Sequence, residues 1–181
     1  MKTKFITLLV VFTTLLIGCK NEKSVDNLNV VTPELIDNTF KVTLNVIVKK
    51  NDDFSLFYTE DGSIDFKGNP IWQNVKGSDN AQDVVFNLPE NVIPTQLRLD
   101  FGMKKDQEDI ILKSVKFEYL GKKFEVSGPN IAIYFTPDVT KCNFDATTGT
   151  ITAVIKDGVR QFPSLYPNEL PVKTEIEKLV K

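Results

Sequence analysis

The sequence contains no histidine, and this absence removes the commonest general base and the commonest metal ligand of proteins. Catalytic triads of the serine or cysteine type therefore have no base, and zinc sites built on histidine or on paired cysteines are excluded. The 24 acidic residues leave a hydrolase with paired carboxylates as an alternative. However, no spacing singles out two of them, and nothing indicates a cofactor. We therefore predict a protein that is not an enzyme.

Cysteine is also scarce, and the first of the two cysteines ends an export signal. Basic Lys2 and Lys4 precede an apolar run from Phe5 to Ile17, and Gly18 stands directly before Cys19. This order is typical of a bacterial lipoprotein signal, and the run is shorter than the ~20 residues of a membrane span. We expect the segment before Cys19 to be removed and Cys19 to carry the acyl chains that anchor the protein to a membrane.

The second cysteine, Cys142, has no disulfide partner in the mature chain, so the domain must rely on its hydrophobic core. We interpret Cys142 as a small core residue. A reactive thiol is the alternative, and it would need a basic neighbour, for which Lys141 is the candidate.

The mature chain is mildly acidic and begins with a polar segment. Without Lys2 and Lys4, 20 basic residues stand against 24 acidic ones, so we expect no general attraction to nucleic acid. Residues 20–38 have little apolar content, which indicates a solvated tether between lipid and domain. Near its end, Thr32-Pro33-Glu34 is typical of the start of a single helical turn.

Beyond the tether, apolar and polar residues alternate in short runs, as they do in half-buried β-strands. Turn residues such as Gly121-Lys122 and Asp157-Gly158 separate the runs. These features predict an all-β fold, an antiparallel β-sandwich of jelly-roll type. The expected strands cover residues 40–48, 54–58, 71–76, 84–88, 97–101, 110–120, 124–126, 131–135 and 150–155.

The C-terminal residues change to a helical pattern. Val172, Ile176 and Leu179 lie near helical spacing, and Pro171 suits a first turn. The predicted organisation is a signal peptide over 1–18, a lipidated N-terminus and tether over 19–38, a β-sandwich over 39–136, and a C-terminal extension over 137–181 that packs on the sandwich.

Three residues are candidates for ligand binding. Trp72 is the one tryptophan, and the amides Gln73 and Asn74 follow it. An exposed tryptophan with neighbouring amides suits the stacking of a sugar ring, whereas a core position is the alternative. Arg98 and Asp100 are two residues apart on a predicted strand, so they share one face. They form either a surface ion pair or polar contacts to a sugar.

Acidic residues also gather around the second expected strand. We expect them near one loop end, where their oxygens would suit calcium. Turn formation is the alternative, because Asp-Gly pairs favour tight turns and the spacing departs from the EF-hand pattern. The sequence leaves both interpretations open for Asp52, Asp53, Glu60, Asp61 and Asp65.

Four segments carry a family resemblance over roughly residues 40–136: Asp53–Tyr58, Val75-Lys76-Gly77, Val84–Pro89 and Leu97–Gly102. In this order they resemble a small β-sandwich module that is found in Bacteroidetes proteins and beside cell-surface polysaccharide glycosyltransferases. The resemblance brings no catalytic residues. It implies an accessory or glycan-associated role.

Together these features predict a lipid-anchored envelope protein that binds carbohydrate or supports surface polysaccharide assembly. The alternative is a structural lipoprotein that binds another envelope protein through a sheet edge or through the C-terminal tail. The segment Lys20–Lys23 partly resembles signals that send Bacteroidetes lipoproteins to the cell surface. We expect the outer membrane, with its periplasmic and surface faces both open.

Overall fold

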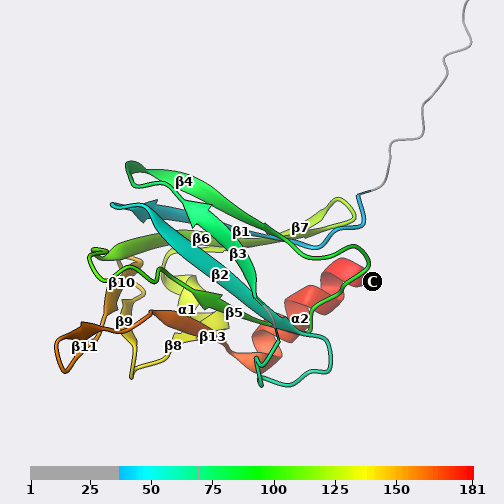
Figure 1. Cartoon of the computed structure of the whole chain (residues 1–181). Helices are drawn as coiled ribbons and strands as arrows, with labels where there is room; N and C mark the ends of the chain where they lie inside the picture. The colour runs from blue at the N-terminus through cyan, green and yellow to red at the C-terminus, as the bar shows by residue number, and fades with distance from the viewer. Residues whose placement is uncertain (1–36, 69) are drawn as a thin grey trace, which may run out of the picture. The chain divides into compact units, whose positions relative to one another are not determined.

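The computed structural model describes residues 37–68 and 70–181, which form two antiparallel sheets packed together and a C-terminal helix (Figure 1). This arrangement confirms the predicted β-sandwich. The predicted signal peptide, the lipidation site Cys19 and the turn at 32–34 lie outside the described residues. In chain order the elements are β1 (Lys41–Val48), β2 (Asp52–Thr59), β3 (Ile71–Val75), β4 (Ser78–Asn87), β5 (Gln96–Asp100), β6 (Ile110–Tyr119), β7 (Lys122–Ser127), η1 (Gly128–Asn130), α1 (Ile131–Tyr134), β8 (Phe135–Pro137), β9 (Cys142–Asp145), β10 (Thr150–Ala153), β11 (Ile155–Lys156), β12 (Val159–Arg160), β13 (Ser164–Pro167) and α2 (Glu169–Val180).

The chain alternates between the two sheets. The first sheet has the order β4-β1-β6-β10-β9, with β7 also paired to β6, and the second has the order β3-β2-β5-β13-β8. The chain crosses from one sheet to the other after β1, β3, β4, β5, β7 and β8, and once more after β10 by way of the two-stranded β11-β12 sheet. As a result β2 and β5 lie side by side inside the second sheet, and β3 lies at its edge.

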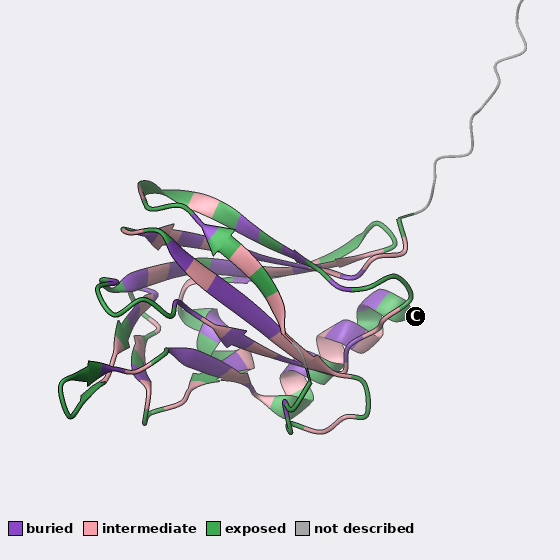
Figure 2. Cartoon of the chain, viewed as in Figure 1, coloured by how far each residue is buried: buried purple, intermediate pink, exposed green. Residues whose placement is uncertain are grey.

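The hydrophobic core lies between the sheets and follows the predicted alternation. Val42, Leu44 and Val46 of β1 are at most 1% exposed. From the second sheet, the rings of Phe54 and Phe101 meet edge to face at 5.4 Å. In Figure 2 the buried colour runs along β2 and β5, whereas most of β3 is exposed or intermediate. Each fully buried side chain of this size stabilises the fold by about 1.5–3 kcal/mol.

The predicted C-terminal helix is confirmed as α2, and it completes the core. Val172, Ile176 and Leu179 are buried, and α2 contacts β5, β6 and β7. Gln96 of β5 donates a hydrogen bond from Nε2 to the carbonyl oxygen of Glu169 at 3.1 Å, which ties the helix start to the second sheet. None of the helices within residues 37–68 and 70–181 combines the length and hydropathy of a membrane span.

The strand predicted over residues 131–135 is wrong. Gly128–Asn130 form a 3-10 turn, Ile131–Tyr134 form one helical turn, and β8 begins only at Phe135. Ile131 and Phe135 are fully buried, whereas Ile133 between them is 54% exposed. A spacing of four residues between the buried positions suits a helical turn, so the short apolar run was ambiguous.

The predicted domain boundary at residue 136 also needs correction. The later strands β9 and β10 belong to the first sheet and β13 to the second, so 39–136 does not hold the whole sandwich. Residues 137–181 are therefore part of both sheets and not an extension that packs against them. The predicted strand 150–155 is likewise divided, because β10 ends at Ala153 and β11 begins at Ile155. These strands have at most four residues, which is too few for an alternation of apolar and polar residues to identify a strand.

Both predicted hairpins are present, with the turn at Asp157-Gly158 as predicted and the turn predicted at Gly121-Lys122 one residue earlier, at Leu120-Gly121. Asp157 and Gly158 have φ values of 52° and 76° between β11 and β12, and Leu120 and Gly121 have values of 48° and 77° between β6 and β7. Paired positive φ angles match the twist of a two-residue hairpin. Leu120 lacks the freedom of glycine, so it holds this conformation at a cost of about 1 kcal/mol.

Candidate functional site

Outward side chains of the second sheet align in one cross-strand row. Trp72 of β3 lies opposite Ser55 of β2, Ser55 lies opposite Asp100 of β5, and Asp100 lies opposite Ser164 of β13. The adjacent Leu56 is fully buried, and side chains alternate along a strand, so this row points away from the core. The structure thus brings Trp72 and Asp100, two of the predicted ligand residues, onto one face.

A pocket of about 90 Å³ opens beside Trp72 on this face, and we call it the Trp72 pocket. Its most exposed lining residues are Trp72, Met103 and Phe162, which are 49%, 45% and 46% exposed. Three large apolar side chains exposed around one hollow are typical of a surface that contacts a ligand. The full lining is Asp53, Ser55, Phe57, Trp72, Asp100, Gly102, Met103 and Phe162.

The surroundings of Trp72 agree with the exposed position that the sequence suggested, and not with the core alternative. Asn74, two residues along β3, donates a hydrogen bond from Nδ2 to Asp53 Oδ1 at 2.8 Å. This contact holds the Asp53 carboxylate at the edge of the Trp72 pocket. An indole face, an amide and a carboxylate therefore lie close together on the second sheet.

Arg98 has a different place from the one predicted for a ligand residue. Its Nε donates to Asp100 Oδ1 at 3.0 Å and its Nη2 donates to Asp100 Oδ2 at 2.8 Å, so the predicted ion pair is confirmed. The guanidinium carbon lies 3.9 Å from the centre of the Phe57 ring, and Nη1 donates to Tyr166 Oη at 3.4 Å. Arg98 does not line the Trp72 pocket. It orients Asp100, which does.

Asp52 does not line the Trp72 pocket, but it forms hydrogen bonds with the loop that does. This carboxylate is fully buried, and its Oδ1 accepts hydrogen bonds from the backbone N–H groups of Asp53, Met103 and Lys104 at 2.8, 2.8 and 3.1 Å. Gln107 Nε2 donates to its Oδ2 at 3.1 Å. Asp52 therefore fixes the loop that carries Met103.

Gly102 is required in this loop. Its φ is +73°, and a Cβ atom there would lie 2.4 Å from Asp52 Oδ2, far inside van der Waals contact. Any other residue would push the buried carboxylate away from its donors. Gly102 lines the Trp72 pocket and also packs against Asp52, so the shape of the pocket wall depends on the position of this buried carboxylate.

The charges at the Trp72 pocket leave it mildly negative. Asp53 and Asp100 contribute two carboxylates, and Arg98 offsets one of them through its bidentate ion pair. Among the described residues that line the pocket, none is a lysine or an arginine. The site therefore suits a ligand with hydrogen-bond donors and disfavours an anion.

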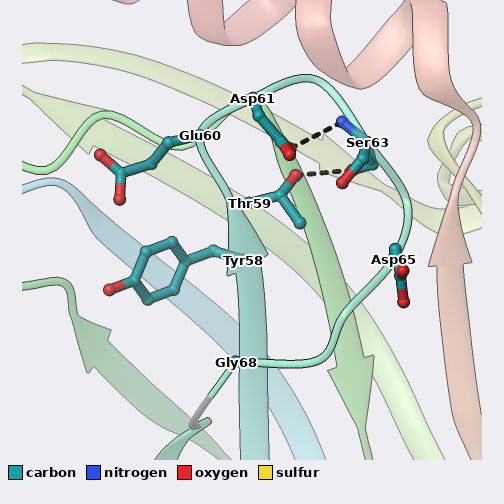
Figure 3. A pocket seen from close by; sticks show the side chains of 7 residues that line it. All are labelled: Tyr58, Thr59, Glu60, Asp61, Ser63, Asp65 and Gly68. Atoms are coloured by element: carbon teal, nitrogen blue, oxygen red, sulfur yellow. Dashed lines mark hydrogen bonds between the residues drawn. The ribbon is translucent and has the colours of Figure 1, made fainter.

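A second, larger pocket of about 380 Å³ lies at the far end of β2 and is lined by Tyr58, Thr59, Glu60, Asp61, Ser63, Asp65 and Gly68 (Figure 3). Most of its polar side chains form hydrogen bonds or ion pairs with other residues of the same loop. Asp61 Oδ1 accepts from the backbone N–H of Ser63 at 3.0 Å, and this hydrogen bond lowers the pKa of Asp61. Thr59 Oγ1 donates to the carbonyl oxygen of Ser63 at 2.6 Å, and Asp65 forms an ion pair with Lys67.

The expectation that the acidic residues share one loop end is wrong. Asp52 and Asp53 begin β2, whereas Glu60 and Asp61 follow its other end. Within residues 37–68 and 70–181, no three His, Cys, Asp or Glu side chains gather so that they could hold a metal ion. Asp61 makes a turn contact with Ser63, so the turn-forming interpretation holds for Asp61 and not for the strand residues Asp52 and Asp53.

Cys142 lies in the core, as predicted. It is fully buried, and its Sγ donates to the carbonyl oxygen of Ser164 at 3.4 Å. Burial raises the pKa of the Cys142 thiol, which opposes reactivity. Lys141, the candidate basic neighbour, forms an ion pair with Asp138 at 3.5 Å.

The sequence did not single out, as ligand residues of the Trp72 pocket, Ser55, Phe57, Gly102, Met103 and Phe162, of which Met103 and Phe162 are the most exposed. Both lie outside strands, where no periodic pattern assigns a face. The one available signal was the Gly102-Met103 pair directly after a predicted strand.

Comparisons with protein-family models, with curated proteins and with solved structures found no match for this chain.

Proposed function

We propose that this protein is a non-enzymatic, lipid-anchored envelope protein that binds carbohydrate at the Trp72 pocket. The observation that carries the proposal is the half-exposed indole of Trp72, which stands beside an apolar hollow and two carboxylates. Sugars combine an apolar C–H face with a rim of hydroxyl groups. The Trp72 pocket offers a surface for each of these.

The chemistry of binding follows from the two kinds of group. The C–H face of a sugar ring stacks on the indole of Trp72, and its hydroxyl groups donate hydrogen bonds to Asp53 and Asp100. Hydrogen bonds to an ionised carboxylate are about twice as strong as neutral ones. Arg98 keeps Asp100 oriented without entering the pocket.

The envelope setting supports the same proposal. Acylation of Cys19 would hold the sandwich at the outer membrane, where surface polysaccharides are assembled. The resemblance to a module beside polysaccharide glycosyltransferases points in the same direction. In this role the protein holds a glycan and leaves the chemistry to another enzyme.

A glycan array with the purified chain tests the proposal. We expect binding to a defined set of glycans, loss of binding in Trp72→Ala and retention in Trp72→Phe, because phenylalanine keeps an aromatic face. Val85→Ala serves as the control, since Val85 is an exposed apolar residue on the other sheet. Absence of binding across host, bacterial and plant glycans by the folded protein would refute the proposal.

The anchor is tested separately. Cys19→Ala should move the protein from the membrane fraction to the soluble fraction, because the thiol that receives the lipid is lost. Membrane attachment of this variant that equals the wild type would contradict lipid anchoring.

A protein partner is the second candidate function, and the free edge of β3 favours it. Within the described residues β3 pairs with β2 alone, so its other edge is open to strand addition. The C-terminal tail is less suited to docking, because α2 already buries Val172, Ile176 and Leu179 in the core. Stoichiometric co-purification of one envelope protein by a chain that binds no glycan would favour this function.

A further inference from the structure

We propose that the sugar bound at the Trp72 pocket carries an acetamido group, whose methyl enters the hollow and whose N–H is donated to a carboxylate at its edge. This inference rests on the proposed function and names the class of ligand. Three properties of the pocket support it: its volume, the character of its walls and its charge.

The volume of the Trp72 pocket suits a small substituent of a sugar better than a whole sugar ring. A cavity of about 90 Å³ has room for roughly three water molecules at about 30 Å³ each. A whole hexose ring is larger than this hollow, which is open to solvent, so the ring fits best over its mouth, stacked on Trp72. A small branch of a few heavy atoms, such as an acetamido group, fills the hollow.

The walls select an apolar end on that branch. Trp72, Met103 and Phe162 surround the hollow, and Phe57 contributes its ring below them. A methyl group entering this hollow leaves water and contacts aromatic and thioether surface. A hydroxyl group can donate to the carboxylates at the edge, but it has no apolar end to contact these walls.

The charged groups at the Trp72 pocket favour an amide substituent on the sugar over a carboxylate or an ammonium group. Asp53 and Asp100 are acceptors, so they match the N–H of an acetamido group. Because the guanidinium of Arg98 is already paired with Asp100, a carboxylate on the sugar meets no unpaired cation at the pocket. A free ammonium is attracted by the mild negative charge, but it must lose its water against apolar walls.

Three oligosaccharides of one length test the inference. All are β-1,4-linked and glucose-configured, and they differ at C2, which carries a hydroxyl, an acetamido or a free ammonium group. Isothermal titration calorimetry with the purified full chain measures each affinity. We expect the acetamido oligomer to bind at least about tenfold more tightly than either of the others, from one buried methyl and one hydrogen bond to a carboxylate.

A variant that fills the hollow separates the substituent from the ring. Ser55 is 3% exposed and lines the Trp72 pocket, so Ser55→Leu should occupy the space of the acetamido group. We expect this variant to lose the preference for the acetamido oligomer, measured as the ratio of the acetamido to the hydroxyl affinity within the same variant. The matched control is Ser114→Leu, because Ser114 is a 9% exposed serine on the other sheet.

A second variant keeps the test valid if Ser55→Leu does not fold. Asp53→Asn keeps the size of the side chain and removes its charge, and it should weaken the acetamido oligomer more than the hydroxyl oligomer. Circular dichroism establishes that each variant is folded before titration.

The possible results distinguish the inference from the proposed function. Equal affinities for the hydroxyl and acetamido oligomers, both lost in Trp72→Ala, would overturn the inference and leave carbohydrate binding intact. Tighter binding of the ammonium oligomer would also overturn the inference. If neither these oligomers nor any glycan of the array binds the folded wild type, both proposals fail.

Discussion

Replacing Asp52 by alanine should destabilise the whole fold, although the residue lies at the start of a strand and beside a loop. Asp52 Oδ1 alone accepts three backbone N–H groups, from Asp53, Met103 and Lys104. Each buried donor left without an acceptor costs about 1–3 kcal/mol, so the three donors together cost at least about 3 kcal/mol. The donor from Gln107 adds to this loss.

Urea unfolding followed by far-ultraviolet circular dichroism measures the effect as a difference in free energy of unfolding. Asp52→Asn keeps one carbonyl oxygen for the backbone donors but turns an amide toward Gln107, so we expect a smaller loss of about 1–2 kcal/mol. Asp53→Ala is the matched control, because Asp53 is partly exposed, lines the Trp72 pocket and bonds to Asn74. We expect it to change stability by less than about 1 kcal/mol. If the free energy of unfolding of Asp52→Ala lies within about 0.5 kcal/mol of the wild-type value, Asp52 does not stabilise this loop as described.

Three further predictions concern the helix, a hairpin and the buried thiol. Ile176→Ala should lower the free energy of unfolding by about 2–5 kcal/mol, because it opens a cavity between α2 and the sheets; urea unfolding checks this, and a loss below about 1 kcal/mol would contradict the packing. Leu120→Asn should raise the free energy of unfolding by about 0.5–1 kcal/mol, because asparagine tolerates the positive φ of 48° better; a lower melting temperature would count against it. In a Cys19→Ser chain, Cys142 should react with iodoacetamide much more slowly when folded than in urea, because burial raises its pKa. The raised pKa also means that the unfolded chain loses the thiol proton first, so stability falls as the pH rises above the ordinary value of 9.0. Equal labelling rates in the two states would refute the buried position.

The sequence predicted the long strands well and the short elements poorly, for a physical reason. Strands such as β1 and β6 have eight and ten residues, and they show alternation because one face meets the core and the other meets water. Strands β9, β10 and β13 have four residues each, and the places of β10 and β13 depend on partners far away in the sequence, β6 and β5. The apolar run at 131–135 satisfied two patterns, and the exposure of Ile133 between buried Ile131 and Phe135 fits the helical turn and not the strand.

The site was predictable in part. Alternation assigned Arg98 and Asp100 to one face, whereas Trp72 was a candidate because it is the one tryptophan and two amides follow it. The sequence had no means of placing Met103 and Phe162 beside Trp72, since that proximity comes from strand order and loop geometry. The roles also divided unexpectedly: Asp100 lines the Trp72 pocket, whereas the donors of Arg98 are used to hold Asp100 and Tyr166.

The outward position of Trp72, Met103 and Phe162 separates recognition from folding. These side chains face solvent while the residues beneath them, Leu56 and Leu99, form the core. About half of each of these side chains is exposed, so a substitution there changes the lining of the Trp72 pocket more than the packed interior. A lineage that carries this sandwich can therefore vary the pocket surface, one exposed side chain at a time, without first acquiring a more stable scaffold.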